Sequence, residues 1–341
     1  MHAMVISATL AHELAPRTPA IETQELVKRY GRSTALAGLS MRVERGEVFG
    51  FLGPNGAGKT TAIKLFLGLT TATSGSGRLL GAPLGDRETR RRIGYLPELF
   101  RYQPWLRARE VLDLHGELAG IAAADRPDEI RLALDTVGLA DRANDLVGTF
   151  SKGMQQRLGL GVALLGRPEL VLLDEPTSAL DPVGRADVRR VIGTARERGT
   201  TVFLNSHMLS EVELVCDRVA VLDAGRLVAA GTLDALLGAD AVRVRVTGLD
   251  HAARQTLTRF GPLHDDRDAG ALAIADIATA RANDPAEGDD GWLTIRPIER
   301  DRVPELVAAI VAAGGRVYAV EPGRASLEER FLALLGERPA R

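Results

Sequence analysis

The sequence has 341 residues, of which 45% are apolar and 26% are charged, as in a globular protein with one large or two modest domains. The formal net charge of -2 excludes an overall basic field, so no nucleic-acid partner is expected. The single cysteine, Cys216, excludes an internal disulfide. The longest apolar runs fall far short of the roughly 20 residues that span a bilayer, so work at a membrane would require a partner.

Residues 1–20 are expected to form a disordered tail. They contain a short apolar patch, but neither a basic leader nor an apolar core long enough for a signal peptide. From about Ile21 to about Gly238, short β-rich runs alternate with helical patterns and glycine turns. This alternation predicts an α/β domain in which helices cover a parallel sheet.

The strongest motif follows a predicted strand at Val48–Leu52 and precedes a helical pattern. The segment GPNGAGKT matches the phosphate-binding loop pattern G-x4-G-K-[ST]. Its glycines let backbone N–H groups converge on phosphate oxygens, and the helix N-terminus favours anions. Lys59 is expected to reach the β- and γ-phosphates of a nucleotide, and Thr60 to bind Mg²⁺. The predicted phosphate-binding residues are Gly53, Asn55, Gly56, Gly58, Lys59, Thr60 and Thr61.

Two acidic residues end a second apolar run, Leu170–Leu173. Asp174 and Glu175 would lie at the carboxyl edge of the parallel sheet, where the phosphate-binding loop also lies. Asp174 is predicted to bind Mg²⁺, and Glu175 to orient and polarise the attacking water. The structural alternative is an Asp-Glu helix cap before Pro176.

Between these motifs lies FSKGMQQR, Phe150–Arg157, ahead of an apolar run. Ser151 is expected to cap a helix at its N-terminus, but that role does not explain Gly153 at a costly early helical position. In combination with the two phosphate motifs, the segment resembles the signature of the nucleotide-binding subunits of ATP-binding cassette (ABC) transporters. The resemblance covers about Ile21 to Gly238, with further likeness toward the C-terminus.

The resemblance implies a P-loop cassette with a RecA-like core, an antiparallel β subdomain and a helical subdomain at about residues 98–167. In this family two cassettes dimerise head to tail, so Ser151 and Gly153 of one copy would close over the γ-phosphate bound by the other. One such chain would need a second copy or a homologous cassette. The family also implies an ATPase that drives a separate integral membrane permease, held in the cytoplasm on the inner face of the membrane.

Four further positions match functional residues of the family. Tyr30 matches the aromatic residue that stacks on adenine, with packing against the sheet as its alternative. Asp181 matches a loop that crosses the dimer interface, or else belongs to a simple turn. His207 matches the switch histidine that contacts the γ-phosphate and the catalytic water, although a histidine after a strand is usually structural. Glu98 replaces the usual Mg²⁺-sensing glutamine and is expected to bind the metal, with a solvated turn acid as its alternative.

The remaining family features concern the partner and the transported substrate. Trp105 is expected to line the groove that accepts a permease helix, or else to belong to the core. The segments YLPE, SKGMQQR and NSHMLSEVE most resemble exporter subunits of the daunorubicin-resistance kind, which implies export of a drug, lipid or polysaccharide. Two alternatives stay open: a cassette ATPase that acts on ribosomes or nucleic acid, and a nucleotide-gated regulator that no longer hydrolyses.

After about Ala241 the pattern changes to that of a smaller domain. RVRVTG, WLTIRPI and RVYAVEP are strand-like, whereas LDHAARQTLTRFG and VPELVAAIVAAGG are helix-like. This order predicts an α+β domain of the βαββαβ, ferredoxin-like type over residues 241–341. It would include an acid-rich loop at about 264–290, in which ALAIADI could form a strand. The capping-box spacing of Ser326 and Glu329 predicts a last helix that ends at Gly336.

Overall fold

The computed structural model describes residues 18–178, 180–237, 241–265, 291–295, 297–322 and 327–336. The chain divides into two compact units, of which the second runs from Asp234 to Leu332 and the first takes the remainder. The predicted tail lies almost entirely outside the described residues. The same holds for most of the acidic loop with ALAIADI, and for the cap at Ser326.

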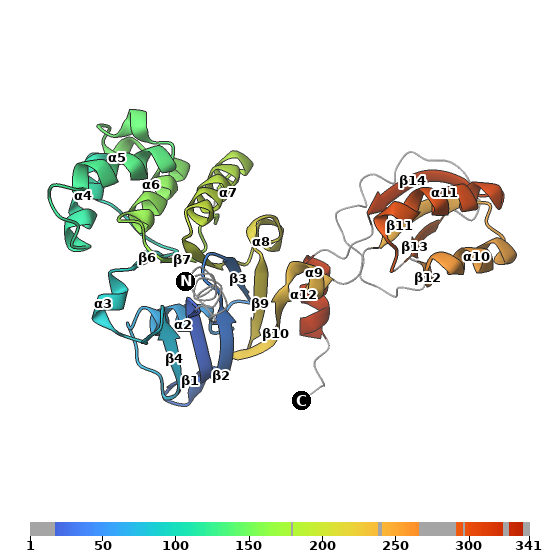
Figure 1. Ribbon diagram of the computed structural model, residues 1–341, viewed down its shortest axis with the longest axis horizontal. Helices are drawn as coiled ribbons and strands as arrows, with labels where there is room; N and C mark the ends of the chain where they lie inside the picture. The colour runs from blue at the N-terminus through green and yellow to red at the C-terminus, as the bar shows by residue number, and fades with distance from the viewer. Residues whose placement is uncertain are drawn as a thin grey trace, which may run out of the picture. The chain divides into compact units, whose positions relative to one another are not determined.

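A six-stranded sheet forms the centre of the first unit (Figure 1). Its strand order is β10-β9-β3-β8-β7-β6, and of these strands only β10 is antiparallel to its neighbour. All residues of β3, β7 and β8 are buried, as expected for central parallel strands with near-continuous apolar sequences. The strands are β3 (Val48–Leu52), β6 (Ile93–Leu96), β7 (Leu170–Asp174), β8 (Thr201–Asn205), β9 (Arg218–Asp223) and β10 (Arg226–Thr232).

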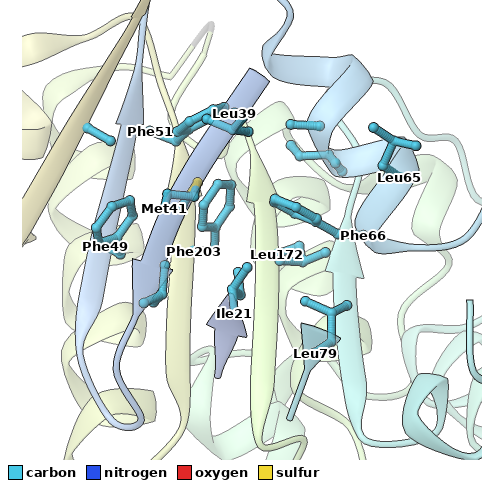
Figure 2. Close-up of a cluster of buried hydrophobic side chains, with 14 of the residues drawn as sticks. Ile21, Leu39, Met41, Phe49, Phe51, Leu65, Phe66, Leu79, Leu172 and Phe203 are labelled. Atoms are coloured by element: carbon cyan, nitrogen blue, oxygen red, sulfur yellow. The ribbon is translucent and has the colours of Figure 1, made fainter. Parts of the chain in front are cut away.

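A second, antiparallel sheet has the order β2-β1-β4-β5. Its strands are β1 (Ile21–Tyr30), β2 (Ser33–Val43), β4 (Ser74–Leu79) and β5 (Ala82–Pro83). Its buried side chains share one apolar core with the central sheet and with α2 (Lys59–Phe66). Figure 2 shows Phe203 of β8 in the middle of this core. Its ring centroid lies 6.0 Å from that of Phe49, 5.2 Å from that of Phe51 and 5.6 Å from that of Phe66.

Phe203→Ala is expected to lower the free energy of unfolding of the first unit by about 3–5 kcal/mol, because it opens a cavity between three other rings. Urea unfolding measures the loss. Leu99→Ala is the control, since the Leu99 side chain is 88% exposed and its truncation is expected to change stability by about 0.5 kcal/mol or less. A loss below about 1 kcal/mol at Phe203 would contradict the central role of this ring.

Three helices lie together between β6 and β7 in the sequence: α4 (Ala108–Leu118), α5 (Arg126–Thr136) and α6 (Lys152–Leu164). Figure 1 shows them gathered to one side of the sheets of the first unit. They form the expected helical subdomain, with 3-10 turns at Ala140–Arg142 and Val147–Thr149. The other helices of this unit are α3 (Arg87–Arg90), α7 (Pro182–Glu197) and α8 (Leu209–Val215).

The second unit has the predicted βαββαβ order, with a fully antiparallel sheet in the order β12-β13-β11-β14. This is the ferredoxin-like arrangement. The alternate residues Val242, Val244 and Val246 of β11 are buried, in a core to which Leu257 and Leu306 contribute from two helices. The elements are β11 (Val242–Thr247), α10 (His251–Leu257), the 3-10 turn Thr258–Phe260, β12 (Leu263–Asp265), β13 (Gly291–Ile295), the 3-10 turn Arg300–Arg302, α11 (Val303–Ala312) and β14 (Arg316–Pro322).

Two helices fall at the limits of these units: α9 (Leu233–Leu237) and α12 (Leu327–Gly336). The last helix thus reaches Gly336, as the sequence predicts. In the part of the chain that the structure describes, no helix combines the length and the apolar character needed to cross a membrane.

Candidate functional site

The carboxyl ends of neighbouring parallel strands bring distant parts of the sequence to one edge of the central sheet. Strand β3 leads into Gly53, β7 ends at Asp174, and Asn205 ends β8 between them. Glu98 follows β6 at the same edge. Open α/β sheets bind their ligands at this edge. The structure therefore brings the predicted phosphate-binding loop next to the predicted acidic residues.

The glycines of the loop are required by the fold of this chain. A Cβ atom on Gly58 would lie 2.3 Å from the carbonyl oxygen of Ala35, and one on Gly53 would lie 2.2 Å from that of Leu222. Gly56 has open space around it but adopts a φ of 81°, which favours glycine. The loop backbone thus packs tightly against β2 and β9, so no side chain fits at Gly53 or Gly58.

Lys59 spans the loop from the first position of α2. Its Nζ donates to the carbonyl oxygens of Gly53 at 2.6 Å and Pro54 at 3.2 Å. Burial lowers the pKa of Lys59, while the carboxylates of Glu175, Asp174 and Glu98 oppose this change. The ammonium group is therefore withdrawn from water and donates to two neutral carbonyl oxygens, and a charged phosphate oxygen in the loop would be a stronger hydrogen-bond partner.

The helix that follows the loop offers an uncapped N-terminus. Gly58 precedes it with a φ of 108° and has no side chain to cap it, and the first turn contains no acidic residue. The free N–H groups of this turn favour an anion. Thr60 is exposed and Thr61 is half-buried in the same turn, so the Thr60 hydroxyl is accessible to a metal ion.

Asp174 lies at the end of β7 and is only 3% exposed. Burial raises the pKa of its carboxyl group, and a hydrogen bond from Asn205 Nδ2 opposes this rise. Within the described ranges, the buried Oδ1 atom of Asn205 has no hydrogen-bond partner. A carboxylate, a threonine hydroxyl and an unpaired amide oxygen are oxygen donors of the kind that Mg²⁺ and its bound waters prefer. The residues at this edge therefore fit the predicted metal.

Glu175 is held in an unusual backbone conformation beside His207. Its φ is 52°, in the left-handed region that a non-glycine residue adopts at some cost. Its Oε2 lies 2.7 Å from Nδ1 of His207, and its N–H donates to the carbonyl oxygen of Asn205 at 2.9 Å. Because a carboxylate only accepts hydrogen bonds, the histidine ring is the donor. The two predicted catalytic residues are thus in direct contact.

The helix-cap interpretation of Asp174 and Glu175 is wrong. The next helix, α7, begins only at Pro182, and its N-cap is Asp181. The Asp181 carboxylate accepts a hydrogen bond from the N–H of Gly184 at 2.7 Å. This cap accounts for Asp181 within one chain, while its predicted place at a dimer interface stays a prediction.

Ser151 caps α6, as the sequence predicts, by accepting a hydrogen bond from the N–H of Met154 at 3.2 Å. Gly153 is different, because a Cβ atom there would meet nothing closer than Ser151 Oγ at 3.9 Å. Packing within the described chain therefore does not require glycine at this position. The surface around Gly153 leaves room for another molecule.

Tyr30, Glu98 and Trp105 all lie at exposed positions. Tyr30 is 49% exposed and its ring faces Lys28 Nζ at 4.8 Å, so it does not pack into the core. Glu98 is exposed, yet its charge helps to raise the pKa of Asp174. Trp105 is 69% exposed, so the interpretation of this residue as a core tryptophan is wrong.

Sequence reasoning missed two residues that contact the site. The side chain of Asn205 donates a hydrogen bond to Asp174, and its backbone carbonyl accepts one from Glu175. The only hint of this role in the sequence is that an amide residue ends an apolar strand. Gln156 of α6 donates from Nε2 to the carbonyl oxygen of Pro176 at 2.8 Å, directly after Glu175. Gln156 belongs to the FSKGMQQR segment, but its contact with Pro176 depends on how the helical subdomain packs against the central sheet.

Comparison with known proteins gives one consistent result. A family model described as ABC transporter matches residues 36–178. The chain is 45% identical over 347 residues to an uncharacterized ABC transporter ATP-binding protein of Synechocystis sp., covering 98% of this chain and 91% of that protein. It is 34% identical over 328 residues to the daunorubicin/doxorubicin resistance ATP-binding protein DrrA of Streptomyces peucetius, covering 94% and 93%. A solved ATP binding subunit of an ABC transporter matches with a TM-score of 0.58 at 31% identity, over 64% of this chain and 92% of that chain.

Proposed function

The chain belongs to the ATP-binding proteins of ABC transporters, which are ATPases, and we propose that it hydrolyses MgATP to drive export through a separate membrane permease. The observation that carries the proposal is the convergence of Lys59, Asp174 and the Glu175–His207 pair at one sheet edge. Action on ribosomes or nucleic acid is not favoured, because relatives that match more than nine-tenths of the chain are named for transport or drug resistance.

The loop residues of this chain would bind the triphosphate. Lys59 would exchange the carbonyl oxygens of Gly53 and Pro54 for β- and γ-phosphate oxygens. The N–H groups of the loop and of the first turn of α2 would surround the same oxygens. Tyr30, which is half-exposed, would stack on adenine. The remaining predicted contacts in the loop are those of Asn55, Gly56, Gly58 and Thr61.

Thr60, Asp174 and Glu98 would hold the magnesium ion that accompanies ATP. When bound, the ion would neutralise negative charge on the phosphate groups. Glu175 would accept a hydrogen bond from the attacking water and align it with the γ-phosphate. His207, whose ring already contacts Glu175, would keep that carboxylate in place and contact the γ-phosphate.

A second cassette would complete the site. The chain carries one phosphate-binding loop and one signature, so a working pair requires a second copy or a homologous cassette. The open surface at Gly153 and the uncharged cap at Ser151 would face the γ-phosphate bound to the partner. Asp181 would lie beside them at the same interface.

The proposal extends to the class of the exported molecule and to a membrane permease as the partner. The resemblance to a daunorubicin/doxorubicin resistance protein supports export of a drug, lipid or polysaccharide. The chain would then work in the cytoplasm, on the inner face of the membrane, through its permease. Purification of the tagged chain from detergent-solubilised cells, with mass spectrometry of its partners, tests this. A stoichiometric multi-span membrane protein is expected, whereas ribosomal proteins or nucleic acid alone would contradict the proposal.

Trp105→Ala is expected to reduce recovery of the permease at least about tenfold, because a large exposed aromatic residue is a typical interface anchor. ATP binding to the isolated chain should stay unchanged. Leu214→Ala is the control, because Leu214 is 66% exposed on α8, outside the helical subdomain. Quantitative mass spectrometry of the purified complexes measures recovery. Equal recovery with both variants would mean that Trp105 does not contact the permease.

A further inference from the structure

Asn205 contacts both acids of the site. It ends β8, pairs in register with Asp174 of the neighbouring strand, and is 2% exposed. Its side-chain Nδ2 donates to the Asp174 carboxylate, and its backbone carbonyl accepts a hydrogen bond from the N–H of Glu175 at 2.9 Å. The positions of both acids are therefore set from the same residue of β8.

The carboxamide of Asn205 matches the needs of the Asp174 carboxylate. A carboxylate only accepts hydrogen bonds, and in the described ranges no side chain other than that of Asn205 donates to Asp174. An apolar residue at this buried position would remove this hydrogen bond. The hydrogen bond therefore restricts the rotation of the Asp174 carboxylate.

The other end of the same carboxamide is unsatisfied. Asn205 Oδ1 is buried and accepts no hydrogen bond from any residue in the described part of the chain. Buried amide oxygens without a donor are rare, because burial removes the hydrogen bonds that they would otherwise make to water. An atom of this kind, in the same carboxamide group that contacts the Asp174 carboxylate at a ligand-binding edge, is suited to accept a hydrogen bond from an ordered water.

We propose that Asn205 is a positioning residue for the divalent cation that accompanies ATP. Its Nδ2 holds Asp174 in the orientation that binds the cation, and its Oδ1 accepts a hydrogen bond from a water in the hydration shell of the cation. Partners of this kind fix the direction of metal-binding groups, and their loss typically weakens metal binding about 10–100-fold. The inference rests on the proposed function, because the cation arrives with the nucleotide.

The test compares ATP binding with and without Mg²⁺, measured by calorimetry on the full chain. In Asn205→Leu, which keeps the size but removes both polar atoms, the Mg²⁺ concentration for half-maximal tightening of ATP binding is expected to rise about tenfold or more. ATP affinity in the presence of a chelator should stay within about twofold of wild type, since the loop contacts to phosphate do not involve Asn205. Asn205→Ala, which adds no bulk, gives the same comparison if the leucine variant does not fold.

Thr201→Val is the matched control, at the other end of the same strand. Thr201 is 1% exposed, and its Oγ1 accepts a hydrogen bond from the N–H of Gly46 at 2.9 Å. The control should lose stability without a shift in Mg²⁺ dependence. Wild-type Mg²⁺ dependence in a folded Asn205 variant would overturn the inference. A wild-type chain that binds no ATP, or binds it equally with and without Mg²⁺, would instead overturn the proposed function.

Discussion

Glu175→Gln is expected to lower ATP turnover at least about 100-fold and to trap an ATP-bound dimer. The amide keeps the size of Glu175 but is a poor acceptor for the proton of the attacking water. ATP binding should survive, because Lys59 and the loop glycines are unchanged. Phosphate release measures turnover, and size-exclusion chromatography with MgATP detects the dimer.

The control for this prediction is Glu169→Gln, which changes an acid at the opposite end of β7. Glu169 pairs with Arg45 and Arg92, each at 2.5 Å, and lies just before Leu170. Its replacement should leave turnover within about twofold of wild type, because the ion pairs are surface contacts worth little. If Glu175→Gln binds nucleotide yet stays monomeric, the closed dimer loses its main support.

Ser151→Arg is expected to abolish turnover while the isolated chain still binds ATP. The long side chain would fill the open surface in front of α6, where the phosphate of the partner is proposed to lie. Among the described residues no hydrogen bond joins Ser151 to the phosphate-binding loop, and its hydroxyl accepts from Met154 of its own helix, so binding within one chain should be retained. Nucleotide binding by calorimetry and phosphate release on the same sample separate the two effects.

Ser151→Ala distinguishes this effect from loss of the helix cap. It removes the hydrogen bond to Met154 and should cost about 1 kcal/mol of stability, without blocking the surface. The arginine variant loses the same cap, so any further loss of turnover reflects the added bulk. An equal loss of ATP binding in Ser151→Arg would place Ser151 in the site of its own chain.

The sequence is sufficient to predict the parts of the site that depend on strand ends. The apolar runs before Gly53 and Asp174 are buried parallel strands, and their carboxyl ends necessarily share an edge. The βαββαβ order of the second unit follows in the same way from its alternating patterns. Local periodicity predicts these strands because burial of both strand faces gives a continuous apolar run, whereas burial of one face gives alternation of apolar and polar residues.

Features that depend on lateral packing were not predictable. Asn205 faces Asp174 only because β8 lies between β3 and β7, and strand order is not encoded in the spacing of apolar residues. The exposure of Trp105 likewise depends on which face of the helical subdomain is left uncovered. The cap before Pro176 was a wrong alternative because the chain makes a further turn and begins α7 at Pro182.

Strand β8 carries Phe203 in the apolar core and Asn205 at the ligand edge, two residues apart and hence on the same face of the sheet. A nucleotide that binds the folded chain but not the unfolded chain would therefore also stabilise this core against thermal unfolding. At 100 times its dissociation constant the gain is about 2.7 kcal/mol. For a unit of this size that corresponds to a rise in Tm of roughly 5–10 °C. Thermal melting with nucleotide thus becomes a screen for occupancy of the site that requires neither the permease nor turnover.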